Sequence, residues 1–229
     1  MRAAFLENTF TVDDVDKVFK IESDQARHLI KVIRIKKNEK ILILNGKGSR
    51  VIACVIHVDR RELSVKLESV DVAVDSRRIS LFLGIPKKEA FESIVKMSSE
   101  IGIKEIFLYR SRFSQQEVEV NERVLKIEES AMLQSNNPYR MKFTIVENYR
   151  DVLNHFDLVV NFSTFTKGDL VEINAQNVLM MIGPEAGFCE DEEDSFNSQP
   201  NVVVCKMSTN ILRAPTALAV GSGYILSKF

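Results

Sequence analysis

The chain has 229 residues, of which 45% are hydrophobic and 28% are charged. This composition is typical of a folded globular protein and argues against a disordered chain. No apolar run approaches the roughly 18 residues that a membrane-spanning helix needs, and the N-terminal stretch lacks the apolar core of a signal peptide, so we expect a cytoplasmic protein with no membrane partner.

The few cysteines and histidines argue against a disulfide framework and against a metal site. The three cysteines, Cys54, Cys189 and Cys205, are odd in number and form no CxxC spacing. The three histidines are far apart in the sequence, so they form no local metal-binding motif. Reduced thiols are typical of cytosolic proteins, and we predict that the protein binds no metal.

The charges are unevenly distributed, although the net charge is only −1. Between residues 27 and 50 the chain is strongly basic, and between residues 185 and 194 it is acidic. The basic segment predicts contacts with phosphates, the alternative being a solvated helix face. Its basic residues are Arg27, Lys31, Arg34, Lys36, Lys37, Lys40, Lys47 and Arg50, and the acidic residues are Glu185, Glu190, Asp191, Glu192, Glu193 and Asp194.

The first seventy residues predict a small barrel or curled sheet with one helix. Ser23 is a favoured N-cap residue, and apolar residues follow it at helical spacing. Asn45 and Gly46 are a strong hairpin signal, because both residue types tolerate a positive φ. The expected strands are residues 40–44, 51–58 and 63–70, and the apolar helix residues are Ala26, Leu29, Ile30 and Ile33.

A polar stretch over residues 71–78 predicts a domain boundary, dividing the chain into domains of residues 1–72 and 73–229. Beyond it, apolar strands alternate with helices, a pattern that favours an α/β fold with a largely parallel sheet and helices on both faces. Gly102 is expected to end one helix and Asn121 to cap the next, while the last helix covers about 215–228. The expected strands are 79–83, 103–109, 157–162, 178–182 and 202–207.

Two turn segments are candidates for binding chemistry, because each follows a strand and precedes a helix. Residues 182–188 contain glycines that let the backbone approach a ligand closely, although an ordinary turn would look similar. Residues 207–217 place Arg213 near the positive end of a helix dipole, where a cation gains nothing. An anionic ligand group would explain Arg213, and so would pairing with the acidic segment. No dinucleotide fingerprint, phosphate loop or nucleophile signature is present.

Five segments in order along the chain resemble motifs of the RsmE family, the ribosomal RNA small subunit methyltransferases E of the SPOUT superfamily. Residues 183–188 (GPEAGF) resemble its GPEGGF motif, and residues 211–217 (ILRAPTA) resemble its ILRxETA motif. Residues 28–34 (HLIKVIR), 100–103 (EIGI) and 129–135 (ESAMLQS) are similar to HHLxxVLR, ELGV and EAxxQS. The chain departs from the pattern at Ala186, Ser208, Asn210 and Pro215.

The resemblance implies a PUA-like β-barrel that binds RNA, followed by a SPOUT methyltransferase domain with a deep trefoil knot. It implies S-adenosylmethionine as cofactor, a homodimer, and methylation of N3 of a uridine in 16S rRNA or in the small ribosomal subunit. The implied catalytic residues are Arg213, for the developing anion, and Glu185, as a candidate base that could equally hold a loop amide.

The other implied site residues fall into two groups. The cofactor-binding residues would be Gly183, Pro184, Gly187, Phe188, Met207, Ser208, Ile211 and Leu212, and the RNA-binding residues would be Arg27, Lys31, Arg34, Lys36 and Lys37. Two alternatives stay open: a non-catalytic RNA-binding or ribosome-assembly protein on the same scaffold, and a SPOUT methyltransferase with another RNA target.

Overall fold

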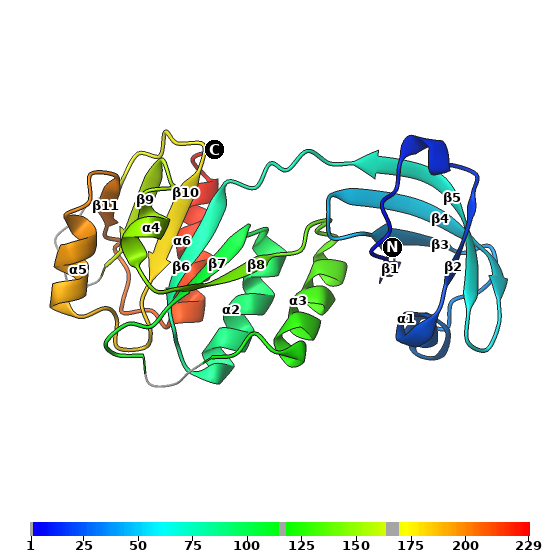
Figure 1. Ribbon diagram of the computed structural model, residues 1–229, viewed down its shortest axis with the longest axis horizontal. Helices are drawn as coiled ribbons and strands as arrows, with labels where there is room; N and C mark the ends of the chain where they lie inside the picture. Colours follow the sequence, from blue (N-terminus) through cyan, green and yellow to red (C-terminus); the bar gives the residue numbers. More distant parts are fainter. Residues whose placement is uncertain (1, 115–117, 164–169) are drawn as a thin grey trace. The chain divides into compact units, whose positions relative to one another are not determined.

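A computed structural model describes residues 2–114, 118–163 and 170–229. It divides into two compact units, shown in Figure 1. The first unit contains Met1–Ser76 and Glu129–Arg140, and the second contains Arg77–Glu128 and Met141–Phe229. The chain therefore enters the second unit, returns to the first for residues 129–140, and ends in the second. In the described part of the chain, no helix is long and apolar enough to cross a membrane.

The first unit is built on a five-stranded sheet in the order β1-β3-β4-β5-β2. Its core side chains alternate along the strands, so that Leu63, Val65 and Leu67 are all buried on one face. Two register shifts between β4 and β5 bend the sheet. The result is a curled half-barrel with edges at β1 and β2. The strands are β1 (Arg2–Phe5), β2 (Val18–Ile21), β3 (Lys40–Leu44), β4 (Ser49–Val58) and β5 (Leu63–Val72).

Local signals in this unit are partly confirmed. The hairpin is confirmed, but the positive φ angles belong to Gly46 (72°) and Gly48 (108°). Asn45 acts through its side chain instead, because its Oδ1 accepts the amide hydrogens of Lys47 and Ser49 at 2.9 Å.

The helical part of the unit consists of the 3-10 helix η1 (Val12–Asp14), α1 (Ser23–Arg27) and the π-helical turn η2 (His28–Val32). The prediction of Ser23 as N-cap was wrong. β2 ends at Ile21 and leaves one extended residue, Glu22, in the cap position, so Ser23 is already helical.

The second unit contains a six-stranded, all-parallel sheet in the order β11-β9-β10-β6-β7-β8. Five strands match the predicted ones, and β8 was missed because it is an edge strand with only Val146 buried. The strands are β6 (Ile79–Gly84), β7 (Glu105–Tyr109), β8 (Lys142–Val146), β9 (Leu158–Phe162), β10 (Val178–Ile182) and β11 (Val202–Cys205). The expected α/β class with a parallel sheet is confirmed.

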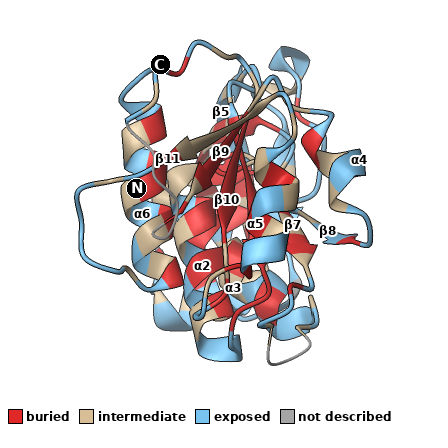
Figure 2. Cartoon of the chain, turned by 90° about the vertical axis from the view of Figure 1, so that its left-hand side faces the viewer, coloured by how far each residue is buried: buried red, intermediate tan, exposed pale blue. Residues whose placement is uncertain are grey.

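Helices cover both faces of this sheet, and Figure 2 shows the buried strands between them. On one face Leu81 and Leu83 pack with α2 (Lys88–Ile101), α6 (Ala214–Leu226) and the start of α3 (Glu122–Ser135). On the other, Phe82 packs with α4 (Tyr149–Leu153) and α5 (Glu190–Asn197). The short α4 was not predicted.

Two predicted helix ends in the second unit are confirmed. Gly102 ends α2 in the left-handed region, with φ of 88°. The Asn121 side chain accepts the amide hydrogens of Arg123 and Val124 at the start of α3. The threading of the last segment as a trefoil knot stays a prediction of the family resemblance.

Candidate functional site

A cavity of about 360 Å³ lies where the carboxyl ends of β9, β10 and β11 meet in the second unit. In a parallel sheet the carboxyl ends of the strands lie on the same side, so the chain segments that follow them converge there. The cavity brings the two predicted turn segments together, although they are separated by helix α5 and strand β11 in the sequence. Seven of the predicted site residues line it: Gly183, Pro184, Glu185, Gly187, Met207, Ile211 and Leu212.

The turn after β10 depends on glycine at two positions. A Cβ on Gly183 would lie 2.8 Å from the carbonyl carbon of Gly187, which is closer than real Cβ atoms come. Gly187 has a φ of 76° and its amide donates to the Pro184 carbonyl at 2.9 Å. Ala186 has no positive φ, so the alanine at this position of the motif fits the turn without strain.

Phe188 does not line the cavity. It is buried below the turn, where its ring lies 5.1 Å from that of Phe196 and 6.3 Å from that of Phe82. The motif phenylalanine therefore anchors the turn to the core of the second unit.

The segment before α6 presents its residues differently from the sequence-based expectation. Ser208 is exposed and does not line the cavity, whereas Thr209 and Lys206 do. Arg213 is the N-cap of α6 and is exposed, between Leu212 and Ala214, which both line the cavity. Within the described residues the Arg213 side chain forms no hydrogen bond or ion pair, so its pairing with the acidic segment is not observed.

Glu185 binds a backbone amide, as expected from the alternative that this carboxylate holds a loop. Its Oε1 accepts the backbone amide of Lys87 at 3.0 Å, and Lys87 is the N-cap of α2. Glu192, in the same acidic run, accepts the amides of Cys189 and Arg112, both at 2.9 Å. These carboxylates therefore satisfy loop and helix-end amides, which would otherwise lack acceptors.

Cys205 also lines the cavity, and its side chain is uncharged. Burial raises the pKa of its thiol above the usual value, so it stays protonated at neutral pH. Among the described residues, no group of three or more histidine, cysteine, aspartate or glutamate side chains could hold a metal ion.

The five predicted RNA-binding residues are all exposed on the first unit. Arg27 pairs with Asp24 at 3.2 Å, while Lys31, Arg34, Lys36 and Lys37 form no ion pair within the described ranges. An exposed side-chain pair such as Arg27 with Asp24 is weak, so it leaves the guanidinium accessible.

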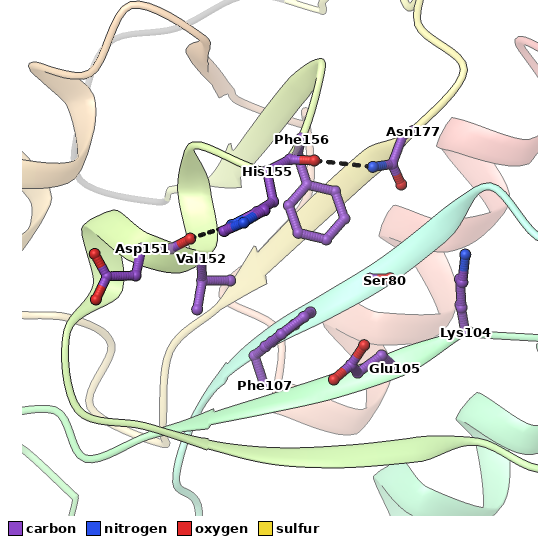
Figure 3. Close-up of a pocket in the computed structure, with 9 residues that line it drawn as sticks. All are labelled: Ser80, Lys104, Glu105, Phe107, Asp151, Val152, His155, Phe156 and Asn177. Atoms are coloured by element: carbon purple, nitrogen blue, oxygen red, sulfur yellow. Dashed lines mark hydrogen bonds between the residues drawn. The ribbon is translucent and has the colours of Figure 1, made fainter.

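A second cavity, of about 390 Å³, lies at the opposite ends of the strands, where β6 and β7 begin (Figure 3). The rings of Phe107 and Phe156 meet edge to face, with centroids 5.8 Å apart. The Asn177 amide donates to the His155 carbonyl at 3.1 Å. None of the predicted site residues line this cavity, and no glycine turn opens its wall, so the first cavity is the candidate site.

Comparison with known proteins agrees with this geometry. The family model described as "RNA methyltransferase domain" matches residues 74–226, and "RNA methyltransferase PUA domain" matches residues 21–68. The chain is 26% identical to the ribosomal RNA small subunit methyltransferase E of Rickettsia conorii, over 86% of this chain and 84% of the relative. It is 23% identical to methyltransferase E 1 of Borreliella burgdorferi, over 91% and 92% of the two chains.

A solved structure shares the fold. The ribosomal RNA small subunit methyltransferase E from Neisseria gonorrhoeae, crystallised with S-adenosyl methionine, matches with a TM-score of 0.82 and 22% identity, over 99% of this chain and 97% of that one. The first family model alone covers more than half of the chain. The chain therefore belongs to the RNA methyltransferases of the RsmE family, with a PUA domain in its N-terminal part.

Proposed function

We propose that this protein transfers a methyl group from S-adenosylmethionine to N3 of a uridine in 16S rRNA, of the U1498 type. The observation that carries the proposal is the cavity formed jointly by the two motif-bearing turns, after β10 and after β11. The names of the relatives support ribosomal RNA of the small subunit as the substrate, and the S-adenosyl methionine in the Neisseria structure supports the cofactor.

The residues around the cavity fit such a cofactor. Its volume of about 360 Å³ lies in the range of small-molecule sites. Within the described residues the amides of Ile211 and Leu212 donate to no protein acceptor, so they are available to a ligand. The Ile211 side chain is 81% exposed, which is unusual for a large apolar residue unless a ligand or partner covers it.

S-adenosylmethionine supplies an electrophilic methyl group on a sulfonium sulfur. The uracil N3 carries a proton and is a poor nucleophile, so the protein must accept that proton and stabilise the resulting anion. Glu185 is the proposed acceptor: one of its oxygens is held by the Lys87 amide, and the other has no partner within the described residues. Arg213 is the proposed cation for the anion, because it is exposed, its side chain is unpaired within the described residues, and both of its chain neighbours line the cavity.

The RNA and a second copy of the chain complete the proposal. Arg27, Lys31, Arg34, Lys36 and Lys37 would bind phosphates, while the target base is splayed out into the cavity. The first domain, residues 1–72, would thus bind RNA, and residues 73–229 would carry out the chemistry in the cytoplasm. A homodimer is proposed because α6 presents small exposed residues, Ala219 and Gly223, that allow close helix packing.

The decisive experiment is methylation by the purified protein of 16S rRNA and of assembled small subunits, with the modified nucleotide mapped afterwards. We expect a single N3-methyluridine that depends on S-adenosylmethionine. A product on another RNA would replace the substrate in this proposal. Absence of both cofactor binding and methyl transfer would leave an RNA-binding protein on the same scaffold.

A further inference from the structure

One carboxylate of the acidic run behaves differently from its neighbours. Glu190, Asp191 and Asp194 are exposed, as expected for a solvated acidic segment, but Glu193 is only 7% exposed. Burying a carboxylate is costly unless hydrogen bonds compensate for the lost water. The position of Glu193 therefore requires an explanation that the net acidity of the run does not provide.

The Glu193 carboxylate is held by a serine at the edge of the cavity. The Ser163 hydroxyl lies 2.8 Å from one Glu193 oxygen and 3.0 Å from the other. Ser163 is itself buried, directly follows β9, and lines the cavity. The hydrogen bond therefore connects α5 to a residue of the cavity wall.

A second hydrogen bond between β9 and α5 lies farther from the cavity. The Asn161 amide donates to the Asn197 side-chain oxygen at 3.0 Å. Ser163, just past the end of β9, is two residues after Asn161, and Glu193 and Asn197 are four apart on α5, so both links lie on one side of each element. Neither asparagine lines the cavity, so of these two links it is the one between Glu193 and Ser163 that reaches the cavity wall.

This arrangement connects two walls of the cavity. One wall is the end of β9, with Phe162 and Ser163, and the other is the turn containing Gly183 and Gly187, which leads directly into α5. A shift of α5 relative to β9 would change the distance between these walls. Because the binding of a ligand is sensitive to such small displacements, the hydrogen bond between Glu193 and Ser163 should affect the affinity of the cavity for its ligand.

We infer that Glu193 is a positioning residue for the cofactor site: through the Ser163 hydroxyl it holds the end of β9 in register with the turn after β10. This inference rests on the proposed function, since the ligand of the cavity is taken to be S-adenosylmethionine. Glu193 itself does not line the cavity, so its effect is exerted through Ser163.

The test compares variants of the two links by calorimetric titration with S-adenosylmethionine and by thermal unfolding. Ser163→Ala and Glu193→Ala should weaken cofactor binding about tenfold, the effect of losing one charge-assisted hydrogen bond. Asn197→Ala is the matched control, because it cuts the other β9–α5 link, and it should lower the unfolding temperature with little change in cofactor affinity. Glu193→Gln keeps an acceptor for Ser163 and should restore most of the affinity.

The outcomes distinguish failure of the proposed function from failure of the positioning role of Glu193. If the unaltered protein does not bind S-adenosylmethionine, the proposed function fails. If it binds, and Ser163→Ala and Glu193→Ala bind as tightly as the unaltered protein or lose no more affinity than Asn197→Ala, then Glu193 has only a structural role. The mild Ser163→Ala variant keeps the test valid even if Glu193→Ala does not fold.

Discussion

The cavity of the second unit and the basic segment of the first unit offer ligands two different kinds of surface. The cavity is formed largely by glycine turns, backbone amides and uncharged side chains such as the Cys205 thiol, and its charged lining residues are Glu185 and Lys206. The five predicted RNA-binding residues of the basic segment are exposed cations, and four of these five form no ion pair within the described residues.

If the two regions bind the proposed cofactor and RNA, they do so through different physical interactions. Recognition by shape and by fixed amides depends little on ionic strength, whereas recognition of phosphates by exposed cations weakens steeply with salt. The variants below separate the two regions, beginning with the largest expected effect.

Arg213→Ala should reduce the rate of methyl transfer about 100-fold to 1000-fold, the usual effect of removing a group that stabilises a developing anion. Cofactor affinity should be unchanged, because the side chain is exposed at the rim. Single-turnover methylation and cofactor titration measure the two quantities. Lys206→Ala is the control, as another exposed cation beside the cavity, and equal effects of both variants would contradict a specific role for Arg213.

Glu185→Gln distinguishes the two roles of this carboxylate. The amide oxygen of glutamine can still accept the Lys87 amide, so the turn and the cofactor affinity should be preserved. Loss of the proton acceptor should lower the rate about 100-fold. A rate equal to that of the unaltered protein would show that Glu185 only anchors the turn.

Gly183→Ala should weaken S-adenosylmethionine binding about tenfold or more, because the new Cβ would lie 2.8 Å from backbone of Gly187 and force the turn to move. Titration calorimetry measures the change. Ala186→Gly, in the same turn, should leave binding nearly unchanged. Equal binding by both variants would show that the turn does not contact the cofactor.

Lys36→Glu combined with Lys37→Glu should weaken RNA binding about tenfold at low salt and reduce the slope of log affinity against log salt by about 2. Cofactor binding should not change. The control is Lys88→Glu with Lys96→Glu, an equal charge change on two exposed residues of α2. An RNA affinity that falls equally in both double variants would indicate a general charge effect.

Two glycines of α6 should affect the free energy of unfolding and not the binding of either ligand. A Cβ on Gly221 would lie 2.9 Å from the Met180 sulfur, so Gly221→Ala should destabilise the fold by about 1–3 kcal/mol. Gly223 has open space around it, so Gly223→Ala should stabilise the helix by about 0.5–1 kcal/mol. Chemical denaturation measures both. A weaker homodimer for Gly223→Ala would support this face of α6 as the interface.

The sequence predicted the structure well where the physical reason for a helix or strand lies in the residues of that segment itself. The predicted strand 178–182 is β10, and all five of its residues are buried, as a central parallel strand requires. Gly102 ends a helix because the absence of a side chain allows its positive φ, and Asn121 begins one because its side chain accepts amide hydrogens of the first turn. The edge strand β8 and the short helix α4 were missed because neither carries a strong apolar period.

The alternation of strands and helices and the two motif-bearing turns could be predicted from the amino-acid sequence, because apolar periodicity and glycine placement act over a few residues. The family resemblance implied one cofactor site for both turns, but the tertiary structure was needed to show that Phe188 lies beneath the cavity and that Glu193 is buried against Ser163. Those facts depend on the order of strands in the sheet, which brings together residues that are far apart in the chain and so leaves no local signal.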